Sequence, residues 1–191
     1  ISFVASFVFG VLFYYSGDIA LSLLAFVLSG TMLGFVFFNF APARVFMGDA
    51  GSLSIGVIFC LLAINSINTN YELSPFWLKE LNKPVLAMSI LVYPLIDTLR
   101  VFSVRILKGI SPFKADKNHI HHKLKALGFN HATSTLFLVF YSLFMMTSQL
   151  ILQLYFLVVD STHIFLIQVG LAAGFLVLFF VLMSKIRSNK K

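Results

Sequence analysis

Three histidines stand close together in a charged segment, residues 111–122, which reads SPFKADKNHIHH. Asp116 could begin a short helix there and Gly128 could end it, because acidic residues favour the position before a helix and glycine favours the position after it. His119 and His122 would then share one face, since residues three apart are neighbours on a helical surface. The segment therefore gathers side chains that could donate hydrogen bonds to an anion or bind a metal ion.

The residue types leave three interpretations of these histidines open. The imidazoles could bind phosphate together with Arg105, Lys108 and Lys114, since Arg and Lys are common partners of phosphate oxygens. A structural zinc site is a second interpretation, although such sites usually include cysteine and this segment contains none. The third is a solvated basic loop without a ligand. The local pattern alone favours the solvated loop, then phosphate binding, then zinc.

A second candidate site centres on Asp49, in a glycine-rich stretch between two apolar segments. Gly48 and Gly51 flank the acid and would allow close approach of a ligand, and Ser52 is expected to cap the helix that follows. A carboxylate beside a helix N-terminus can hold a metal–phosphate complex, because the helix end favours the anion and the carboxylate favours the cation. A turn that Asp49 only caps explains the same residues equally well.

Two ionisable residues, Asp97 and Arg100, lie in the sequence PLIDTLR within an apolar segment. Their spacing of three places them on one helix face. Ionisable groups at membrane depth are costly and usually functional; an ion pair that only packs two helices together is the alternative. The helix is expected to continue to Lys108 and to stop at Gly109, which would place Arg105 in its last turn.

The composition indicates that these sites belong to a membrane protein. Of the 191 residues, 59% are hydrophobic, 11% are charged and 23 are phenylalanine, which leaves too little polar surface to cover a core in water. Runs such as LSLLAFVLSGTMLGFVFF do not alternate, so they favour helices over barrel strands. We predict an all-α polytopic integral membrane protein with about six transmembrane helices, at approximately 1–15, 20–38, 52–68, 84–104, 132–158 and 163–184.

The distribution of positive charge predicts the orientation of the chain. Half of the 14 lysines and arginines lie within residues 100–125, and four more lie in the C-terminal tail, at about 185–191. Because cytoplasmic loops are enriched in Lys and Arg, we expect this tail and the loops at about 39–51 and 105–130 to face the cytoplasm. The basic residues cluster beside hydrophobic segments, so the net charge of +7 does not indicate nucleic acid.

Taken together, PARVFMGDAGSLSIG and the later PLIDTLRVFSVRILKGISPFKADKNHIHH resemble two motifs of the bacterial polyprenyl-phosphate N-acetylhexosamine-1-phosphate transferase family. The resemblance implies transfer of a sugar 1-phosphate from a UDP-N-acetylhexosamine, with UDP-N-acetylglucosamine the expected donor, to undecaprenyl phosphate, with release of UMP. It implies Mg²⁺, or Mn²⁺ in its place, and a multi-pass enzyme of the bacterial inner membrane that works at the cytoplasmic face and can form oligomers. The reaction would be the first membrane step of a cell-envelope polysaccharide.

The resemblance also assigns roles to residues. Asp49 matches an aspartate that ligates or supports Mg²⁺, while Arg105 and His119 match positions that hold the donor diphosphate or nucleotide; these three would be the catalytic residues. Further substrate-binding residues would be Lys108, His121 and His122, and supporting residues would be Asp97, Ser111 and Asp116.

One part of the family pattern is missing from the sequence. The family's adjacent Asp-Asp pair and its Asn- and Asp-rich loop precede these motifs, whereas Asp18 is the only acid before Asn39. We therefore expect residues 1–191 to be one membrane domain of an N-terminally truncated enzyme, inactive when expressed alone. Two other functions stay open: a transporter or flippase for an anionic lipid or solute, and a catalytically inactive homologue that binds lipid phosphate.

Overall fold

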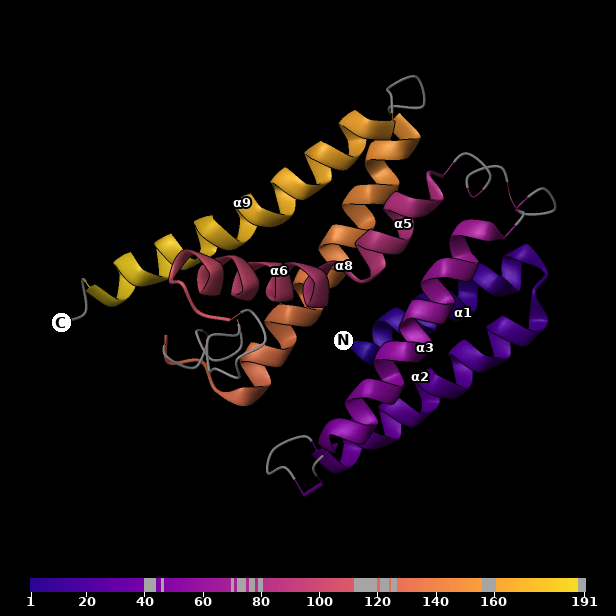
Figure 1. The fold of residues 1–191 in the computed structure, drawn as a ribbon, viewed down its shortest axis with the longest axis horizontal. Coiled ribbons are helices and arrows are strands. Elements are labelled where there is room, and N and C mark those ends of the chain that lie inside the picture. Colours follow the sequence, from indigo (N-terminus) through magenta and orange to yellow (C-terminus); the bar gives the residue numbers. More distant parts are fainter. Residues whose placement is uncertain are drawn as a thin grey trace. The chain divides into compact units, whose positions relative to one another are not determined.

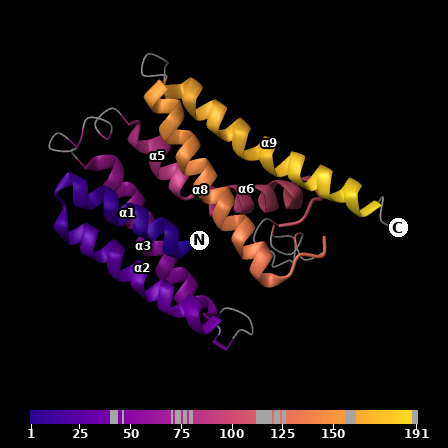
Figure 2. The ribbon, with the colours of Figure 1, turned by 180° about the vertical axis from the view of Figure 1, so that it is seen from behind.

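The computed structural model describes residues 1–39, 44–45, 47–69, 71, 75, 78, 81–111, 120, 124, 127–155 and 161–188, apart from the side chains of 131, 155, 161, 180 and 182–188. The chain divides into two compact units, which Figures 1 and 2 show from opposite sides. Residues 1–90 and 149–157 form the first unit; residues 91–148 and 158–191 form the second. The prediction of one domain over the whole chain stays a prediction.

Helices account for all the regular structure that these residues form. In chain order they are α1 (Ser2–Ser16), α2 (Ile19–Asn39), α3 (Gly48–Asn68), α5 (Lys83–Ile90), α6 (Val92–Leu107), α8 (His131–Tyr155) and α9 (Ser161–Ser188). In lipid an α-helix satisfies its backbone polar groups internally, which explains why the long apolar runs adopt it. The predicted all-α, multi-pass membrane fold is confirmed.

The number of spans is close to the predicted six but is not identical to it. Within the described part of the chain, α2, α3, α8 and α9 each contain a segment long and apolar enough to cross a membrane. The pair α5 and α6 makes a fifth span if the two helices are counted as one. Helix α1 has 15 residues, fewer than the roughly 20 that a span needs.

The span predicted at 84–104 is interrupted at Leu91, and this continuous helix was therefore a wrong prediction. Pro94 explains the interruption. It has no N–H to donate to the carbonyl of Ile90, four residues earlier, and its ring clashes with that carbonyl in a continuous helix. The ladder of hydrogen bonds resumes one residue later, where the N–H of Leu95 donates to the carbonyl of Leu91 over 3.1 Å.

In the first unit, α1 and α2 form a hairpin, and α3 also packs against α1 (Figures 1 and 2). Gly17 ends α1 with a φ of 83°, a left-handed conformation that glycine adopts without strain. Asp18 then begins α2, since its carboxylate accepts a hydrogen bond from the N–H of Leu21 over 3.1 Å. The hydroxyl of Ser22 donates to the carbonyl of Gly10 across the hairpin over 2.9 Å.

In the second unit, α6 contacts α9, and polar side chains join α8 to α9. The hydroxyl of Tyr141 donates to the carbonyl of Ala172 over 3.1 Å. The amide of Gln168 donates to the carbonyl of Met145 over 2.7 Å. Hydrogen bonds of this kind hold membrane helices together where the hydrophobic effect does not distinguish helix from lipid. These contacts support α6, which carries the candidate site.

Candidate functional site

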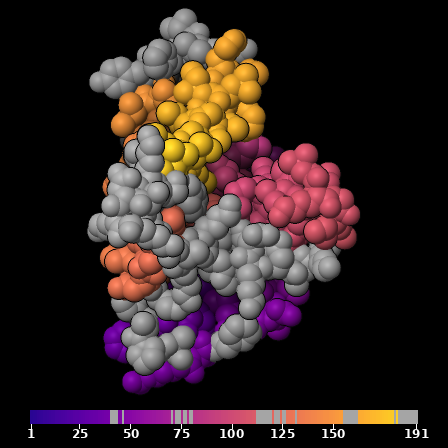
Figure 3. Space-filling view, turned by 90° about the vertical axis from the view of Figure 1, so that its left-hand side faces the viewer, coloured from indigo at the N-terminus to yellow at the C-terminus, as the bar shows by residue number. Residues whose placement is uncertain are grey.

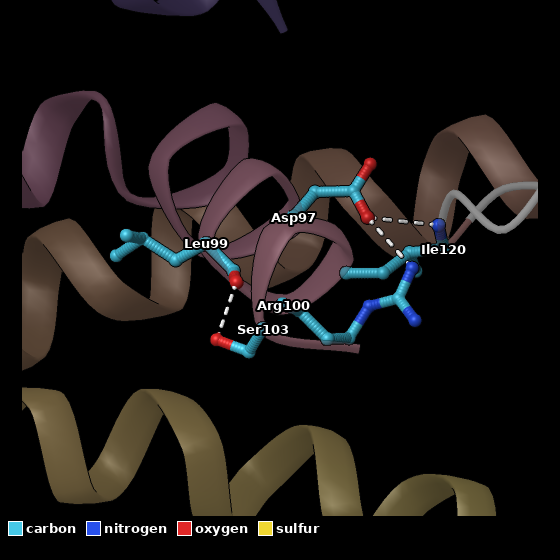
Figure 4. Close-up of polar contacts among 5 residues, drawn as sticks. All are labelled: Asp97, Leu99, Arg100, Ser103 and Ile120. Atoms are coloured by element: carbon cyan, nitrogen blue, oxygen red, sulfur yellow. Dashed lines mark hydrogen bonds and ion pairs between the residues drawn. The ribbon is translucent and has the colours of Figure 1, made fainter. Parts of the chain in front are cut away.

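The carboxylate of Asp97 is the centre of the best-defined polar cluster in the second unit (Figure 4). Its Oδ1 accepts a hydrogen bond from the guanidinium of Arg100 over 3.1 Å, three residues along the same helix. The same oxygen accepts a second hydrogen bond, of 3.0 Å, from the backbone N–H of Ile120. Asp97 thus joins α6 to Ile120, which stands between His119 and His121 in the sequence.

Apolar contacts accompany this hydrogen bond. The side chains of Ile120 and Leu124 are both fully buried, and they are spaced by four residues, as on one face of a helix. The turn that follows ends at Gly128, where φ is 93° and the N–H of Phe129 donates to the carbonyl of Leu124 over 3.2 Å. Gly128 thus has the positive φ that is expected of the residue after a helix, whereas the predicted start of that helix at Asp116 lies outside the described residues. At Ile120 and Leu124 the segment is not a solvated loop.

The buried face of α6 carries both an acid and a base. Asp97, Val101 and Arg105 succeed one another at intervals of four residues, and their exposed fractions are 6%, 2% and 7%. On the opposite side Leu99 and Leu107 are exposed, at 62% and 86%, as expected for a surface in contact with lipid. Arg105 therefore lies on the same helix face as the carboxylate that holds Ile120, about 12 Å further along the axis.

Helix α6 ends as the sequence predicts. Gly109 has a φ of 66°, and its N–H donates to the carbonyl of Ile106 over 2.9 Å. The N–H of Ile110 donates to the carbonyl of Arg105, also over 2.9 Å. This pair of bonds is the Schellman arrangement, which satisfies carbonyls that a helix end otherwise leaves unpaired. Residues 106–110 at this helix end are exposed, Lys108 among them, and atoms of α6 appear in pink in Figure 3.

Asp49 belongs to the first unit, where it lies exposed in the first turn of α3. The helix begins at Gly48, whose φ is 68°. Residues 48–51, which were predicted to belong to the loop at 39–51, are therefore helical. The expected cap by Ser52 is wrong: its hydroxyl lies inside the first turn and donates to the carbonyl of Asp49 over 3.0 Å. The early start leaves the Asp49 carboxylate close to the unpaired N–H groups of the helix end.

The remaining predicted site residues divide between exposed and undescribed positions. Ser111 is exposed beyond the end of α6. Five predicted residues lie outside the described part of the chain: Lys114, Asp116, His119, His121 and His122. Among the residues described, no three His, Cys, Asp or Glu side chains come together in a group that could hold a metal ion.

One contributor to the cluster could not be recognised from residue types. Ile120 takes part through its backbone N–H, which every residue except proline possesses, so its side chain gives no sign of the contact. The only indication in the sequence is an apolar residue among three histidines, with Leu124 four positions later. That spacing is typical of a buried helix face, and it correctly marks the two residues that anchor the segment.

Comparison with known proteins supports the resemblance that the two motifs indicate. Residues 1–67 match the model of a family described as glycosyl transferase family 4. A protein of Haemophilus influenzae named undecaprenyl-phosphate alpha-N-acetylglucosaminyl 1-phosphate transferase is 31% identical over 177 residues, which are 90% of this chain and 45% of that protein. A Bacillus subtilis protein, the probable undecaprenyl-phosphate N-acetylglucosaminyl 1-phosphate transferase, is 35% identical over 120 residues, 63% of this chain and 31% of its own length.

A third relative is named for decaprenyl phosphate instead of undecaprenyl phosphate. The decaprenyl-phosphate N-acetylglucosaminephosphotransferase of Mycolicibacterium smegmatis is 32% identical over 133 residues, 66% of this chain and 33% of that protein. The chain therefore spans less than half the length of each of these curated relatives. No solved structure matches it significantly. Residues 1–67 thus match the model of glycosyl transferase family 4, and the predicted resemblance of the chain to the polyprenyl-phosphate N-acetylhexosamine-1-phosphate transferases is confirmed.

Proposed function

We propose that the protein transfers N-acetylhexosamine 1-phosphate from a UDP-sugar, with UDP-N-acetylglucosamine the expected donor, to undecaprenyl phosphate and releases UMP. In the overall reaction an oxygen of the lipid phosphate forms a bond to the β-phosphorus of the donor. The bond from that phosphorus to the bridging oxygen breaks, and UMP leaves with the electron pair. The product is a polyprenyl diphosphate that carries the sugar, the first lipid-linked intermediate of a cell-envelope polysaccharide.

The observation that carries this proposal is the hydrogen bond between Asp97 and Ile120. It holds Ile120, the residue between His119 and His121 in the sequence, at the face of α6 that also carries Arg105. A diphosphate donor presents dense negative charge, and it needs several cationic or N–H donors within a small volume. Arg105 and Lys108 at the end of α6, together with the histidines that flank Ile120 in the sequence, are residue types that supply donors of that kind.

Each cationic residue suits a different part of this task. The planar guanidinium of Arg105 can donate two parallel hydrogen bonds to phosphate oxygens, and the burial of this residue strengthens them. Lys108 is exposed at the helix end, where a flexible ammonium can neutralise a further oxygen. We assign His119, His121 and His122 to the same donor, with imidazole N–H groups as hydrogen-bond donors.

Asp49 is the residue that we propose for Mg²⁺, with Mn²⁺ as an alternative ion. An exposed carboxylate at a helix N-terminus fits such an ion, because Mg²⁺ keeps several waters and is often held by one or two carboxylates together with substrate phosphates. When bound, the ion would neutralise phosphate charge as a Lewis acid. Asp49 would keep it beside the helix end.

The proposed orientation places Asp49, Arg105 and the histidine segment on the cytoplasmic side, with the C-terminal tail. It rests on the concentration of Lys and Arg in residues 100–125 and near the chain end. A nucleotide sugar reaches the membrane from the cytoplasm, while the lipid phosphate lies at the membrane surface. This face is therefore the one at which both substrates can meet.

A transfer assay with the intact gene product tests the proposed function. Membranes that contain the protein are supplied with UDP-N-acetylglucosamine, undecaprenyl phosphate and Mg²⁺, and UMP is measured together with sugar in the lipid extract. We expect both products to appear, and both to require the lipid phosphate. If the folded protein is present and no UMP is released, the proposal is contradicted.

The broken span favours one second candidate, a transporter or flippase for an anionic lipid. Discontinuous helices such as α5 and α6 occur at the binding sites of transporters. That function predicts movement of a labelled polyprenyl phosphate between the leaflets of a vesicle, without any UDP-sugar and without UMP. The transfer assay and the vesicle assay therefore give opposite results for the two functions.

A further inference from the structure

The hydrogen bond between Asp97 and Ile120 connects residues that are 23 positions apart, so it belongs to the tertiary structure and not to helix α6 alone. An ion pair that served only the helix would be complete with Arg100, three residues away at 3.1 Å. The second bond uses the same carboxylate oxygen, Oδ1, and accepts a backbone N–H from the middle of the histidine sequence (Figure 4).

We propose that Asp97 is a positioning residue, which fixes the histidine segment for donor binding by holding the backbone N–H of Ile120. The inference rests on the proposed function for its consequence, but the contact itself does not. A bond between a carboxylate and a backbone N–H is charge-assisted and stronger than one between neutral groups. It acts on the main chain at Ile120, which is bonded directly to His119 and His121.

The surroundings of Asp97 make this bond effective. The residue is only 6% exposed, so water competes little for its oxygens. The guanidinium of Arg100 keeps the carboxylate paired at membrane depth, where an unpaired charge is costly. Ile120 and Leu124, both fully buried, add apolar contacts that hold the same segment. Arg100 therefore stabilises the carboxylate, and the carboxylate holds the segment.

Three substitutions in the intact, membrane-embedded protein separate this role from a purely structural one. Asp97→Ala removes both acceptor oxygens. Asp97→Asn keeps one amide oxygen in place, which can still accept the N–H of Ile120, and it is the variant that is expected to fold best. Ser103→Ala is the matched control: it lies on the exposed face of the same helix, where its hydroxyl donates only to the carbonyl of Leu99 over 2.8 Å.

Amide hydrogen exchange over residues 111–130 measures the anchor directly and needs no activity. In Asp97→Ala we expect exchange of the Ile120 amide to be about 10- to 100-fold faster, the range expected for loss of one charge-assisted hydrogen bond. Asp97→Asn should restore most of the protection, and Ser103→Ala should match the unsubstituted protein. Unchanged exchange in Asp97→Ala, or equal exchange in the Ala and Asn variants, would overturn the proposal.

Steady-state kinetics measures the consequence for donor binding. We expect Asp97→Ala to raise KM for UDP-N-acetylglucosamine by about tenfold, with KM for undecaprenyl phosphate unchanged, and Asp97→Asn to recover most of the donor KM. Equal increases in both KM values would overturn the positioning role. If the unsubstituted protein released no UMP while Asp97→Ala still accelerated exchange, the anchor would be supported and the proposed function would be rejected.

Discussion

The carboxylate of Asp97 accepts a hydrogen bond of 3.0 Å from the backbone N–H of Ile120, although 23 residues separate the two in the chain. The bond holds Ile120, which stands between His119 and His121 in the sequence, at the buried face of α6. Arg105 lies on that face as well, two turns later. We propose that the cationic residues near the end of α6 and the histidines next to Ile120 in the sequence serve one site, and the predictions below test its members.

Substitution of Asp49 by Asn should lower turnover on the order of 100-fold, because an amide ligates Mg²⁺ weakly and does not carry the charge that balances it. Asp18→Asn is the matched control, since Asp18 also begins a helix and Asn caps a helix as well as Asp. Both variants should reach the membrane in normal amounts. Turnover of Asp49→Asn close to that of the control would exclude an essential role for this carboxylate.

Arg105→Lys should raise KM for the UDP-sugar by about tenfold while it preserves the positive charge, because an ammonium cannot make the bidentate contact of a guanidinium. Arg105→Met removes the charge but keeps the length of the side chain, and it should lower kcat/KM further. The measurement is the dependence of initial rate on donor concentration. If Lys replaced Arg without loss, the residue would serve topology and not phosphate recognition.

His119→Ala should reduce the rate at subsaturating UDP-sugar by about tenfold, the effect of one lost hydrogen bond to a charged oxygen. His119→Asn retains an N–H donor and should recover part of the rate. His163→Ala, an exposed histidine near the start of α9, is the control and should be neutral. An unchanged rate in His119→Ala, together with stoichiometric zinc in the purified protein, would favour the zinc interpretation.

Gly109→Ala should lower the free energy of unfolding by about 1–2 kcal/mol, because a side chain is strained at a φ of 66°. The end of α6 would fray, and donor KM would rise with the loss of order around Arg105. Gly34→Ala is the control, since Gly34 lies within α2 and a Cβ there meets no atom within 4 Å. Unfolding in mixed detergent measures both variants. Equal stability of the two would show that the turn does not depend on glycine.

The sequence was sufficient to predict most of the helices and two of their ends. Long apolar runs leave the backbone no alternative to helix in lipid, and Gly109 and Gly128 end their turns because both positions need positive φ. The break at Leu91 was missed although its cause was visible, since Pro94 lies inside the apolar run. The start of α3 at Gly48 was also missed, because no side chain caps it.

The candidate site was predictable only in part. Asp97 and Arg100 could be recognised from the sequence because they are charged residues within an apolar run. The partner of Asp97, the backbone N–H of Ile120, cannot be recognised from the residue type. The two residues are 23 positions apart, and local sequence patterns do not predict a contact over that distance. The pairing of two distant parts through a backbone group is therefore a property of the fold.

The most direct test of the proposed function follows the phosphorus itself. UDP-N-acetylglucosamine that carries a radioactive label at its β-phosphorus is incubated with undecaprenyl phosphate, Mg²⁺ and the intact gene product, and the lipid and aqueous phases are separated. Transfer of a sugar 1-phosphate predicts that the label enters the lipid in step with the sugar, while unlabelled UMP appears in the aqueous phase. Label that stays in the aqueous phase as UDP, or as unconsumed donor, would contradict the account.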